Sequence, residues 1–315
     1  MGKPIAIVGI GAIMPDAMQL SEYWSNILAG KDSIREIPEK YWRIEDFYDP
    51  DPSARDKSYG YKGGIVGDIE FDSVGYGIPP TAMESISVEQ LYALVVARQA
   101  LLDADMIGRN SKHFNREKTG VVIAASIGKN AFSYSRREDI PRTRKILRNS
   151  GIPEPVVERV IQRLTDIELE WTENSEPGFL ANVTAGRIAN RFDLHGTNCA
   201  VDAACASGVA ALKIAFGELQ SGDCDVVLAG GVNLDMTATA FISFCKTPAI
   251  SKSNASRPLD ADTDGMLLGD GVAMVVLKRL DDAERDGDRI YAIVKSVGSS
   301  GDGRAKSIFA PSPEG

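Results

Sequence analysis

The chain of 315 residues lacks the features that define several classes of protein. It has no run of about 18 apolar residues, so we expect no membrane span. Basic residues do not predominate, and a net charge of −9 argues against nucleic acid as a partner. The opening residues are too short and too interrupted by glycine for a signal peptide. The four cysteines form no CxxC pair, which argues against a zinc site or a disulfide framework and favours a reducing cytoplasm.

The sequence does contain a cysteine between an expected strand and an expected helix. Apolar residues at 198–201 predict a buried strand, and the apolar spacing from Val209 to Leu219 predicts a one-faced helix. Cys205 lies between them, where the free N–H groups and the dipole of a helix N-terminus favour a thiolate. Its small neighbours leave room for a substrate carbonyl, as in the nucleophile elbow of serine hydrolases. Cys205 is therefore our candidate nucleophile, and the alternative is a buried structural cysteine.

Histidine is scarce as well, which leaves Cys205 without an evident base. A cysteine nucleophile needs a proton acceptor or a cation nearby. His195 precedes Cys205 across the expected strand, which would hold it about 30 Å away if that strand were fully extended. His113 lies in a polar stretch at 110–118. We expect both histidines to be surface loop residues.

Apolar strands alternate with helices, which predicts a layered α/β domain with a largely buried sheet. The expected strands are 5–8, 120–125, 198–201, 225–231, 272–277 and 290–297, and the expected helices are 20–28, 87–104, 181–192, 209–219, 236–244 and 281–285. The insertion at 136–170 has an apolar stripe, and we expect a solvated helix packed on the main body. The linker-like stretch 251–256 suggests a boundary, which divides the chain into residues 1–250 and 251–315.

Two motifs are incomplete. The glycines at 9 and 11 would begin a dinucleotide-binding fingerprint, but its third glycine is replaced by Met14, so a structural turn is the better interpretation. The stretch at 260–265 resembles the start of a calcium-binding loop. The twelfth position of such a loop must be Glu, and here it is Gly271, which argues against calcium.

The segment at 201–208, Val-Asp-Ala-Ala-Cys-Ala-Ser-Gly, resembles the active-site segment of β-ketoacyl-acyl-carrier-protein synthases, the ketosynthases. Colinear resemblance runs from Ile5 to Gly315 and includes the stretches at 5–11, 182–189, 230–232, 257–260, 264–265 and 269–271. Finer features resemble the ketosynthase domain of polyunsaturated fatty acid synthases and of iterative type I polyketide synthases. They lie at 41–49, 56–59, 171–175, 246–249 and 306–311.

The resemblance implies a thiolase-like fold, in which two similar α/β halves stack in αβαβα layers, usually in a cytoplasmic homodimer. It implies a decarboxylative Claisen condensation in fatty acid or polyketide synthesis, with acyl and malonyl thioesters as substrates. Cys205 would take the acyl chain from an acyl-carrier protein, and its backbone N–H would form half of an oxyanion hole. No cofactor bound to the chain itself is implied, because phosphopantetheine arrives on the carrier protein.

The chain departs from the family pattern in two ways. The two catalytic histidines of the family follow the nucleophile, but no histidine follows Cys205 here. We therefore expect the first half of the fold to be complete and the second to be truncated, so that condensation requires the missing C-terminal half. The usual Gly-Glu-Gly is Gly-Asp-Gly at 269–271. That Glu helps hold a monovalent cation in some members, so Asp270 is a candidate cation ligand.

Two alternatives remain open. One is a non-catalytic dimerisation subunit, similar to the chain-length factors, although those proteins replace the nucleophile that Cys205 retains. The other is a thiolase-type acyltransferase that uses Cys205 with free coenzyme A.

Overall fold

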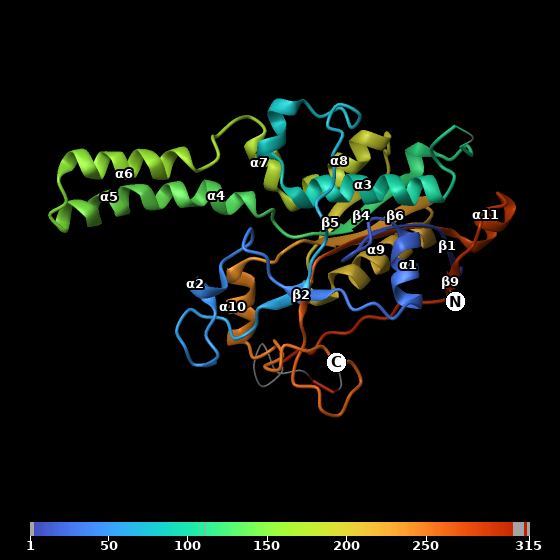
Figure 1. Ribbon diagram of the computed structural model, residues 1–315. Coiled ribbons are helices and arrows are strands. Elements are labelled where there is room, and N and C mark those ends of the chain that lie inside the picture. Colours follow the sequence, from blue (N-terminus) through green and yellow to red (C-terminus); the bar gives the residue numbers. More distant parts are fainter. Residues whose placement is uncertain (1–2, 110, 305–311, 314–315) are drawn as a thin grey trace.

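A six-stranded mixed sheet runs through the computed structural model, in the strand order β5-β4-β6-β8-β1-β9 (Figure 1). Its strands are β1 (Ile5–Ile13), β4 (Thr119–Ala124), β5 (Asn198–Val201), β6 (Val226–Asn233), β8 (Gly271–Arg279) and β9 (Ala292–Val294). The strands β5, β4 and β6 are parallel, whereas β8 is antiparallel to both β6 and β1. The structure describes residues 3–109, 111–304 and 312–313. The expectations at residues 1–2 and 306–311 therefore lie outside the described residues.

Helices cover both faces of this sheet, as the alternation of strand and helix predicts. In β4, Val121 and Ile123 belong to the core under α3 (Val88–Asp103) and α8 (Ala181–Phe192). The alternate residues Val122 and Ala124 belong to the core under α9 (Ser207–Ser221) on the other face. A strand buried on both faces needs apolar residues at every position, which explains the continuous apolar run of β4.

The glycines of β1 allow α3 to lie very close to the sheet. A Cβ atom on Gly11 would come within 2.4 Å of the Val96 carbonyl oxygen, and one on Gly9 within 2.6 Å of that of Ala100. The expected glycine turn is therefore wrong, because the strand continues through both glycines to Ile13. These residues are glycine because the helix backbone takes the space of a side chain.

The predicted boundary at residues 250/251 does not separate two sheets. We expected the strand at 272–277 to open a second half. Instead, the strand β8 lies inside the first sheet, with Leu277 opposite Ile7 of β1 on one side and opposite Val227 of β6 on the other. The first α/β layer unit therefore extends at least to the end of β8 at Arg279.

A small three-stranded sheet, in the order β2-β3-β7, lies beside the main sheet. It consists of β2 (Ile34–Glu36), β3 (Lys62–Gly64) and β7 (Leu268–Gly269). Trp42 and Phe241 pack together in its core, with ring centroids 5.4 Å apart. Other helices and 3₁₀ turns of the described residues are α1 (Leu20–Leu28), α2 (Ile44–Phe47), η1 (Pro80–Ser85), η2 (Arg116–Lys118), α7 (Ser175–Phe179), α10 (Ala238–Lys246) and α11 (Leu280–Arg285).

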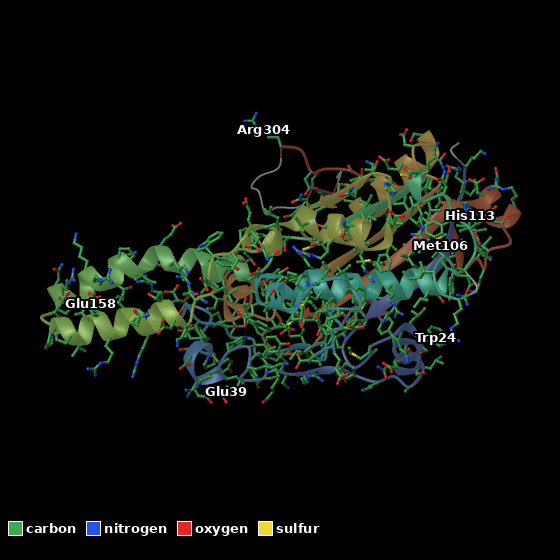
Figure 2. The ribbon with its side chains drawn as sticks, turned by 90° about the horizontal axis from the view of Figure 1, so that it is seen from above. Trp24, Glu39, Met106, His113, Glu158 and Arg304 are labelled. Carbon is green, nitrogen blue, oxygen red and sulfur yellow. The ribbon has the colours of Figure 1, made fainter. Side chains whose placement is uncertain are left out.

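The insertion after β4 is a helical hairpin that projects from the main body (Figures 1 and 2). Its elements are α4 (Asn130–Arg136), η3 (Arg137–Asp139), α5 (Ile140–Asn149) and α6 (Glu154–Asp166). The expectation of a helix packed on the main body is wrong, because the apolar stripe of α6 buries Val157 and Ile161 against the hairpin itself. None of the described helices is long and apolar enough to cross a membrane.

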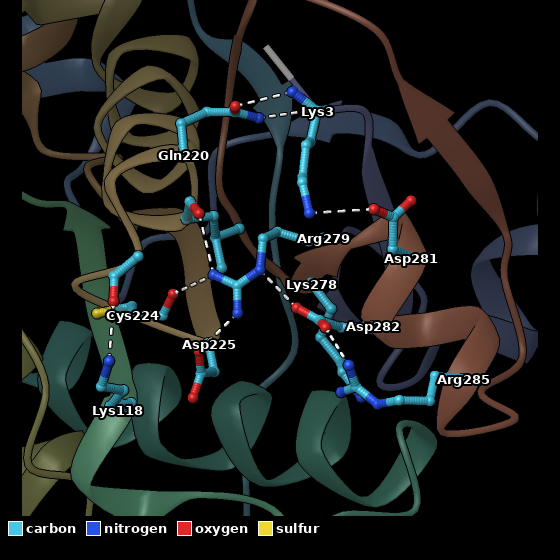
Figure 3. A network of polar contacts seen from close by, with 12 residues as sticks. Lys3, Lys118, Gln220, Cys224, Asp225, Lys278, Arg279, Asp281, Asp282 and Arg285 are labelled. Carbon is cyan, nitrogen blue, oxygen red and sulfur yellow. Dashed lines mark hydrogen bonds and ion pairs between the residues drawn. The ribbon is translucent and has the colours of Figure 1, made fainter.

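Arg279 holds the end of the sheet at which the inner strand β8 finishes (Figure 3). The guanidinium of Arg279 donates to the carbonyl oxygens of Leu219, 3.0 Å away, and of Cys224, 2.8 Å away. It also pairs with the carboxylates of Asp225 and Asp282. One side chain therefore joins the end of α9, the start of β6 and the start of α11.

Candidate active site

Cys205 lies in the single turn η4 (Ala204–Ala206), between β5 and α9. This is the predicted position, where a strand leads into a helix N-terminus. The thiol of Cys205 is exposed, whereas Cys224 and Cys245 are buried and Cys199 is half-buried. The alternative of a buried structural cysteine is therefore wrong for Cys205.

Two side chains hold the turn that presents Cys205. Ala204 has a left-handed backbone with a φ of 49°, which is strained for a residue with a Cβ atom. The carboxylate of Asp202 accepts a hydrogen bond from the Ala204 N–H at 3.0 Å. The hydroxyl of Ser207 accepts from the Ala203 N–H at 2.8 Å and donates to the Ala204 carbonyl oxygen at 2.6 Å. The strained turn is therefore fixed by hydrogen bonds from both sides of the cysteine.

Cys205 opens into a cavity of about 530 Å³ at the carboxyl ends of the three parallel strands. Ser126 follows β4, Asp202 follows β5 and Asn233 ends β6, and all three line the cavity. The helix α10 and the strand β7 also contribute to the lining, including Phe244. The carboxyl ends of parallel strands are where α/β folds bind ligands. The arrangement therefore places an accessible thiol in a cleft large enough for a substrate.

Comparison with known proteins identifies the chain. Residues 2–283 match the family model described as "Beta-ketoacyl synthase, N-terminal domain". The chain belongs to the β-ketoacyl synthase family. The matched range includes β8, in agreement with the place of this strand in the first sheet. The resemblance recognised in the sequence is thereby confirmed.

The ketosynthase relatives of this chain belong to large synthases. The chain is 37% identical over its full length to a subunit of the polyunsaturated fatty acid synthase of Thraustochytrium sp., and it covers 11% of that protein. It is also 32% identical over its full length to the PKS-NRPS hybrid synthetase ATPKS of Aspergillus niger, of which it covers 15%. The chain therefore spans a small part of the curated relatives that it matches.

Solved ketosynthases confirm the thiolase-like fold class. The oxazolomycin ketosynthase domain KS7 from Streptomyces albus aligns with a TM-score of 0.77 and 27% identity, over 97% of this chain and 47% of that one. The ketosynthase from module 6 of the bacillaene synthase of Bacillus subtilis also aligns with a TM-score of 0.77, at 28% identity, over 99% of this chain and 46% of that one. The chain thus spans about half the length of each solved ketosynthase.

The structure brings neither histidine to the ketosynthase cavity. His113 is an exposed loop residue, as predicted. The His195 side chain is 48% exposed and lies 2.9 Å from a carboxylate oxygen of Asp193. Neither residue is among the described residues that line the cavity. The expectation that both histidines are surface loop residues is confirmed, and no histidine lines the cavity among the described residues.

Asp270 is buried beside a second cavity, of about 450 Å³. Burial raises the pKa of its carboxyl group to about 6, against the opposing effect of Lys129. Its Oδ1 atom has no hydrogen-bond partner, which fits one ligand of a cation. However, no group of three or more His, Cys, Asp or Glu residues within the described ranges is arranged to hold a metal ion. Asp270 therefore stays a candidate ligand of a monovalent cation, and no step of the reaction is assigned to a cation.

Local sequence patterns do not reveal most of the residues that surround Cys205. Ser126 and Asn233 had a usable signal, because each adjoins the carboxyl end of a predicted buried strand and such ends meet at one edge of a parallel sheet. The roles of Asp202 and Ser207 depend on the strained φ of Ala204, which no local pattern predicts. Phe244 reaches the cavity from α10, which lies far along the chain. Its position depends on the packing of the small sheet.

Proposed function

We propose that this chain carries the nucleophile of a β-ketoacyl synthase and that Cys205 holds the growing acyl chain as a thioester. The observation that carries the proposal is the exposed thiol of Cys205, on a strained turn that opens into a 530 Å³ cavity. Membership of the ketosynthase family supports the same role. The substrates are an acyl thioester and a malonyl thioester, both carried on the phosphopantetheine of an acyl-carrier protein.

The first step is a transfer of the acyl group to Cys205. The Cys205 sulfur attacks the thioester carbonyl carbon, a new C–S bond forms, and the bond to the phosphopantetheine sulfur breaks. The released phosphopantetheine thiol takes up the proton that Cys205 loses. In the second step malonyl-carrier protein loses CO₂, and the resulting carbanion attacks the Cys205 thioester. A C–C bond forms, the C–S bond breaks, the released Cys205 thiolate takes up a proton from water, and the 3-oxoacyl product leaves on the carrier protein.

The backbone of the turn suits the charge that develops in both steps. The carbonyl oxygen of the acyl group becomes negative when sulfur or carbon attacks it. The backbone N–H of Cys205, at the start of α9, would donate to that oxygen as one half of an oxyanion hole. Because Asp202 and Ser207 fix the turn, this donor is oriented before the substrate arrives.

We also propose that a second α/β half covers α9 in the complete enzyme. The helix α9 carries apolar residues on its solvent side, where Val209 is 59% and Ile214 is 37% exposed. Apolar side chains that gather on the solvent side of a helix commonly mark a surface that another protein unit covers. The solved relatives are about twice as long as this chain. That second half would also supply the two catalytic histidines that the family pattern implies and that the described residues do not place near Cys205.

The edge strand β5 supports the proposal of a homodimer. Among the described strands β5 pairs with β4 alone, so its other edge presents unpaired backbone groups. An exposed strand edge is a template for pairing with another chain. Free cysteines are consistent with the cytoplasmic location that we propose.

The test is condensation by the full-length protein that contains this chain. We expect it to convert octanoyl- and malonyl-carrier protein into 3-oxodecanoyl-carrier protein with release of CO₂, and we expect Cys205→Ala to abolish the product. Product from octanoyl-coenzyme A and acetyl-coenzyme A instead, without loss of CO₂, would favour the thiolase-type acyltransferase. The absence of any acyl transfer would favour a non-catalytic dimerisation subunit.

A further inference from the structure

A second cavity, of about 450 Å³, adjoins the cavity that contains Cys205. It lies on the α9 side of the main sheet (Figure 1). Five residues line both cavities: Gly208, Gly231, Asn233, Gly269 and Gly271. Because four of these five are glycines, little side-chain volume separates the two cavities. Any group that occupies the second cavity in the complete enzyme therefore lies next to the nucleophile.

The sheet face that lines this cavity is incompletely covered. In β8, Val272, Met274 and Val276 belong to the core under α3 and are at most 1% exposed. The alternate residue Val275, on the cavity side, is only half-buried, and so is Ile10 of β1. Apolar side chains that stay partly exposed on inner strands commonly mark a surface that another protein layer covers. The second cavity therefore has the character of an interface.

Asp270 brings an unpaired polar group to this largely apolar cavity. The residue is 6% exposed and lines the cavity, and its Oδ1 atom has no hydrogen-bond partner among the described residues. A buried acceptor without a donor is unfavourable, and native proteins rarely retain one. The unpaired atom is explained if a donor enters the cavity from another part of the complete enzyme.

The charges around Asp270 favour a cation as that donor. Lys129 pairs with Asp235, with 3.7 Å between the nitrogen and the carboxylate oxygen. Both residues and Glu89 interact electrostatically with Asp270, so three carboxyl groups face one ammonium group. The Oε2 atom of Glu89 is likewise buried without a partner in the described part of the chain. An excess of carboxylates attracts a positive group. The second cavity is therefore complementary in charge to a lysine or arginine side chain.

We propose that the second α/β half inserts a lysine or arginine side chain into this cavity, where it pairs with Asp270 beside the nucleophile. Such a side chain packs its aliphatic part on Val275 and Ile10 and extends its charged end to the carboxylate. The length of the relatives supports this occupant, because the chain covers 47% and 46% of the two solved ketosynthases. The inference rests on the second half that the proposed function includes, and it goes further by naming the residue that receives it.

The first test is a structure of the full-length protein that contains this chain. We expect a lysine or arginine nitrogen of the second half within about 4 Å of the Asp270 carboxylate. A water molecule, a metal ion or a side chain from residues 1–315 in that place would overturn the proposal. A full-length protein without a second α/β half would overturn it as well.

The second test is the sign of the effect of Asp270→Asn in the full-length protein at neutral pH. Although burial raises the pKa of Asp270 to about 6 in this chain, the carboxyl group is mostly ionised at neutral pH, and pairing with a cation would lower that pKa. The substitution would leave the inserted cation unpaired, so hydrogen–deuterium exchange of the β8 amides should become at least about tenfold faster. Without such a cation, it removes an unpaired buried charge. Slower or unchanged exchange would therefore overturn the proposal.

Two controls complete the exchange measurement. Asp262→Asn changes an exposed carboxylate that does not line the cavity, and it should leave the exchange of β8 unchanged. An equal acceleration in this control would overturn the proposal. Asp270→Glu keeps the negative charge and should stay closer to the wild type than Asp270→Asn does.

The choice of salt separates an inserted side chain from a bound metal ion. We expect Asp270→Asn to have the same effect in potassium chloride and in tetramethylammonium chloride, whereas an effect confined to potassium would overturn the proposal in favour of a monovalent metal cation. Neither the structure nor the exchange depends on acylation of Cys205. If Cys205 accepts no acyl group, the proposed function fails, and these measurements still decide the pairing at Asp270.

Discussion

The two ends of α9 are held in opposite ways. At its C-terminal end, Arg279 stabilises the helix terminus by donating to the carbonyl oxygen of Leu219 and by pairing with two carboxylates (Figure 3). At its N-terminal end, the helix begins beside the strained, exposed turn of Cys205. The same contrast separates the two ends of β8, since Arg279 ends the strand and Asp270 immediately precedes it.

The difference separates a part of the fold that paired charges stabilise from a part that keeps strain and unpaired polar groups. Arg279 is a nearly buried charge with four acceptors around it, so little of its polar surface is left unpaired. Asp270 is a buried carboxyl group with an unpartnered oxygen atom. Functional sites commonly retain such strain and unpaired groups. The Cys205 end is therefore built for access and the Arg279 end for rigidity.

The largest expected effect is on stability, at the C-terminal end of α9 that Arg279 holds. Arg279→Met should destabilise the protein by about 3 kcal/mol, because it leaves Asp225 without its cation, removes one of the two cations of Asp282 and takes a donor from two carbonyl oxygens. Urea denaturation measures this loss. The control Arg285→Met removes a largely exposed partner of Asp282 and should leave the midpoint unchanged. Similar midpoints for both variants would show that Arg279 does not hold this end.

The next effect concerns Asp270 at the other end of β8. Burial raises the pKa of this carboxyl group from 3.8 to about 6, so between those values the folded state keeps a proton that the unfolded state has released. Stability should therefore fall as the pH rises from about 4 to 6, by about 2 kcal/mol from this group. Asp270→Asn should remove this part of the slope in denaturation curves measured across the range. A slope equal to that of the wild type would show that Asp270 ionises normally.

Much of this architecture could be predicted from the sequence where the signal is local. Periodicity located β4, β5 and α9, and hence the position of Cys205 between a strand and a helix. The pairing of β8 could not be predicted, because a strand that enters the middle of a sheet is specified by contacts with β1 and β6, far away in sequence. The linker-like stretch at 251–256 indicated a boundary before β8, but the main sheet continues across it.

The insertion and the site show the same limit. The apolar stripe of α6 indicated correctly that one face is buried, but it carried no information on whether the main body or a second helix covers that face. Likewise, the small residues around Cys205 predicted an accessible turn. The strain at Ala204 and the hydrogen bonds of Asp202 and Ser207 arise from the tertiary path of the chain.

A smaller effect tests the turn itself. Ser207→Ala removes both hydrogen bonds that the hydroxyl makes to the turn, so the acylation rate of Cys205 should fall about tenfold. Mass spectrometry of Cys205 over time with octanoyl-N-acetylcysteamine measures this rate. The control Ser221→Ala removes a serine at the opposite end of the same helix, and it should leave the rate unchanged. Equal rates for the two variants would contradict the role of Ser207.

The smallest effect comes from the backbone strain. Ala204→Gly should stabilise the protein by roughly 0.5 kcal/mol, because glycine adopts a φ of 49° without the cost of a Cβ atom. Ala206→Gly should do the reverse, since Ala206 has an ordinary helical backbone with a φ of −85°. Paired urea denaturation measures both. A loss of stability in both variants would show that the turn is not strained at Ala204.

The central claim is that the turn at the N-terminal end of α9 presents Cys205 as a nucleophile. The most direct measurement is mass spectrometry of the full-length protein after incubation with octanoyl-N-acetylcysteamine. We predict an octanoyl adduct on Cys205 that is absent from Cys205→Ala, with Cys199, Cys224 and Cys245 unmodified because they are less exposed. An adduct on one of those three residues, or none on Cys205, would contradict the account.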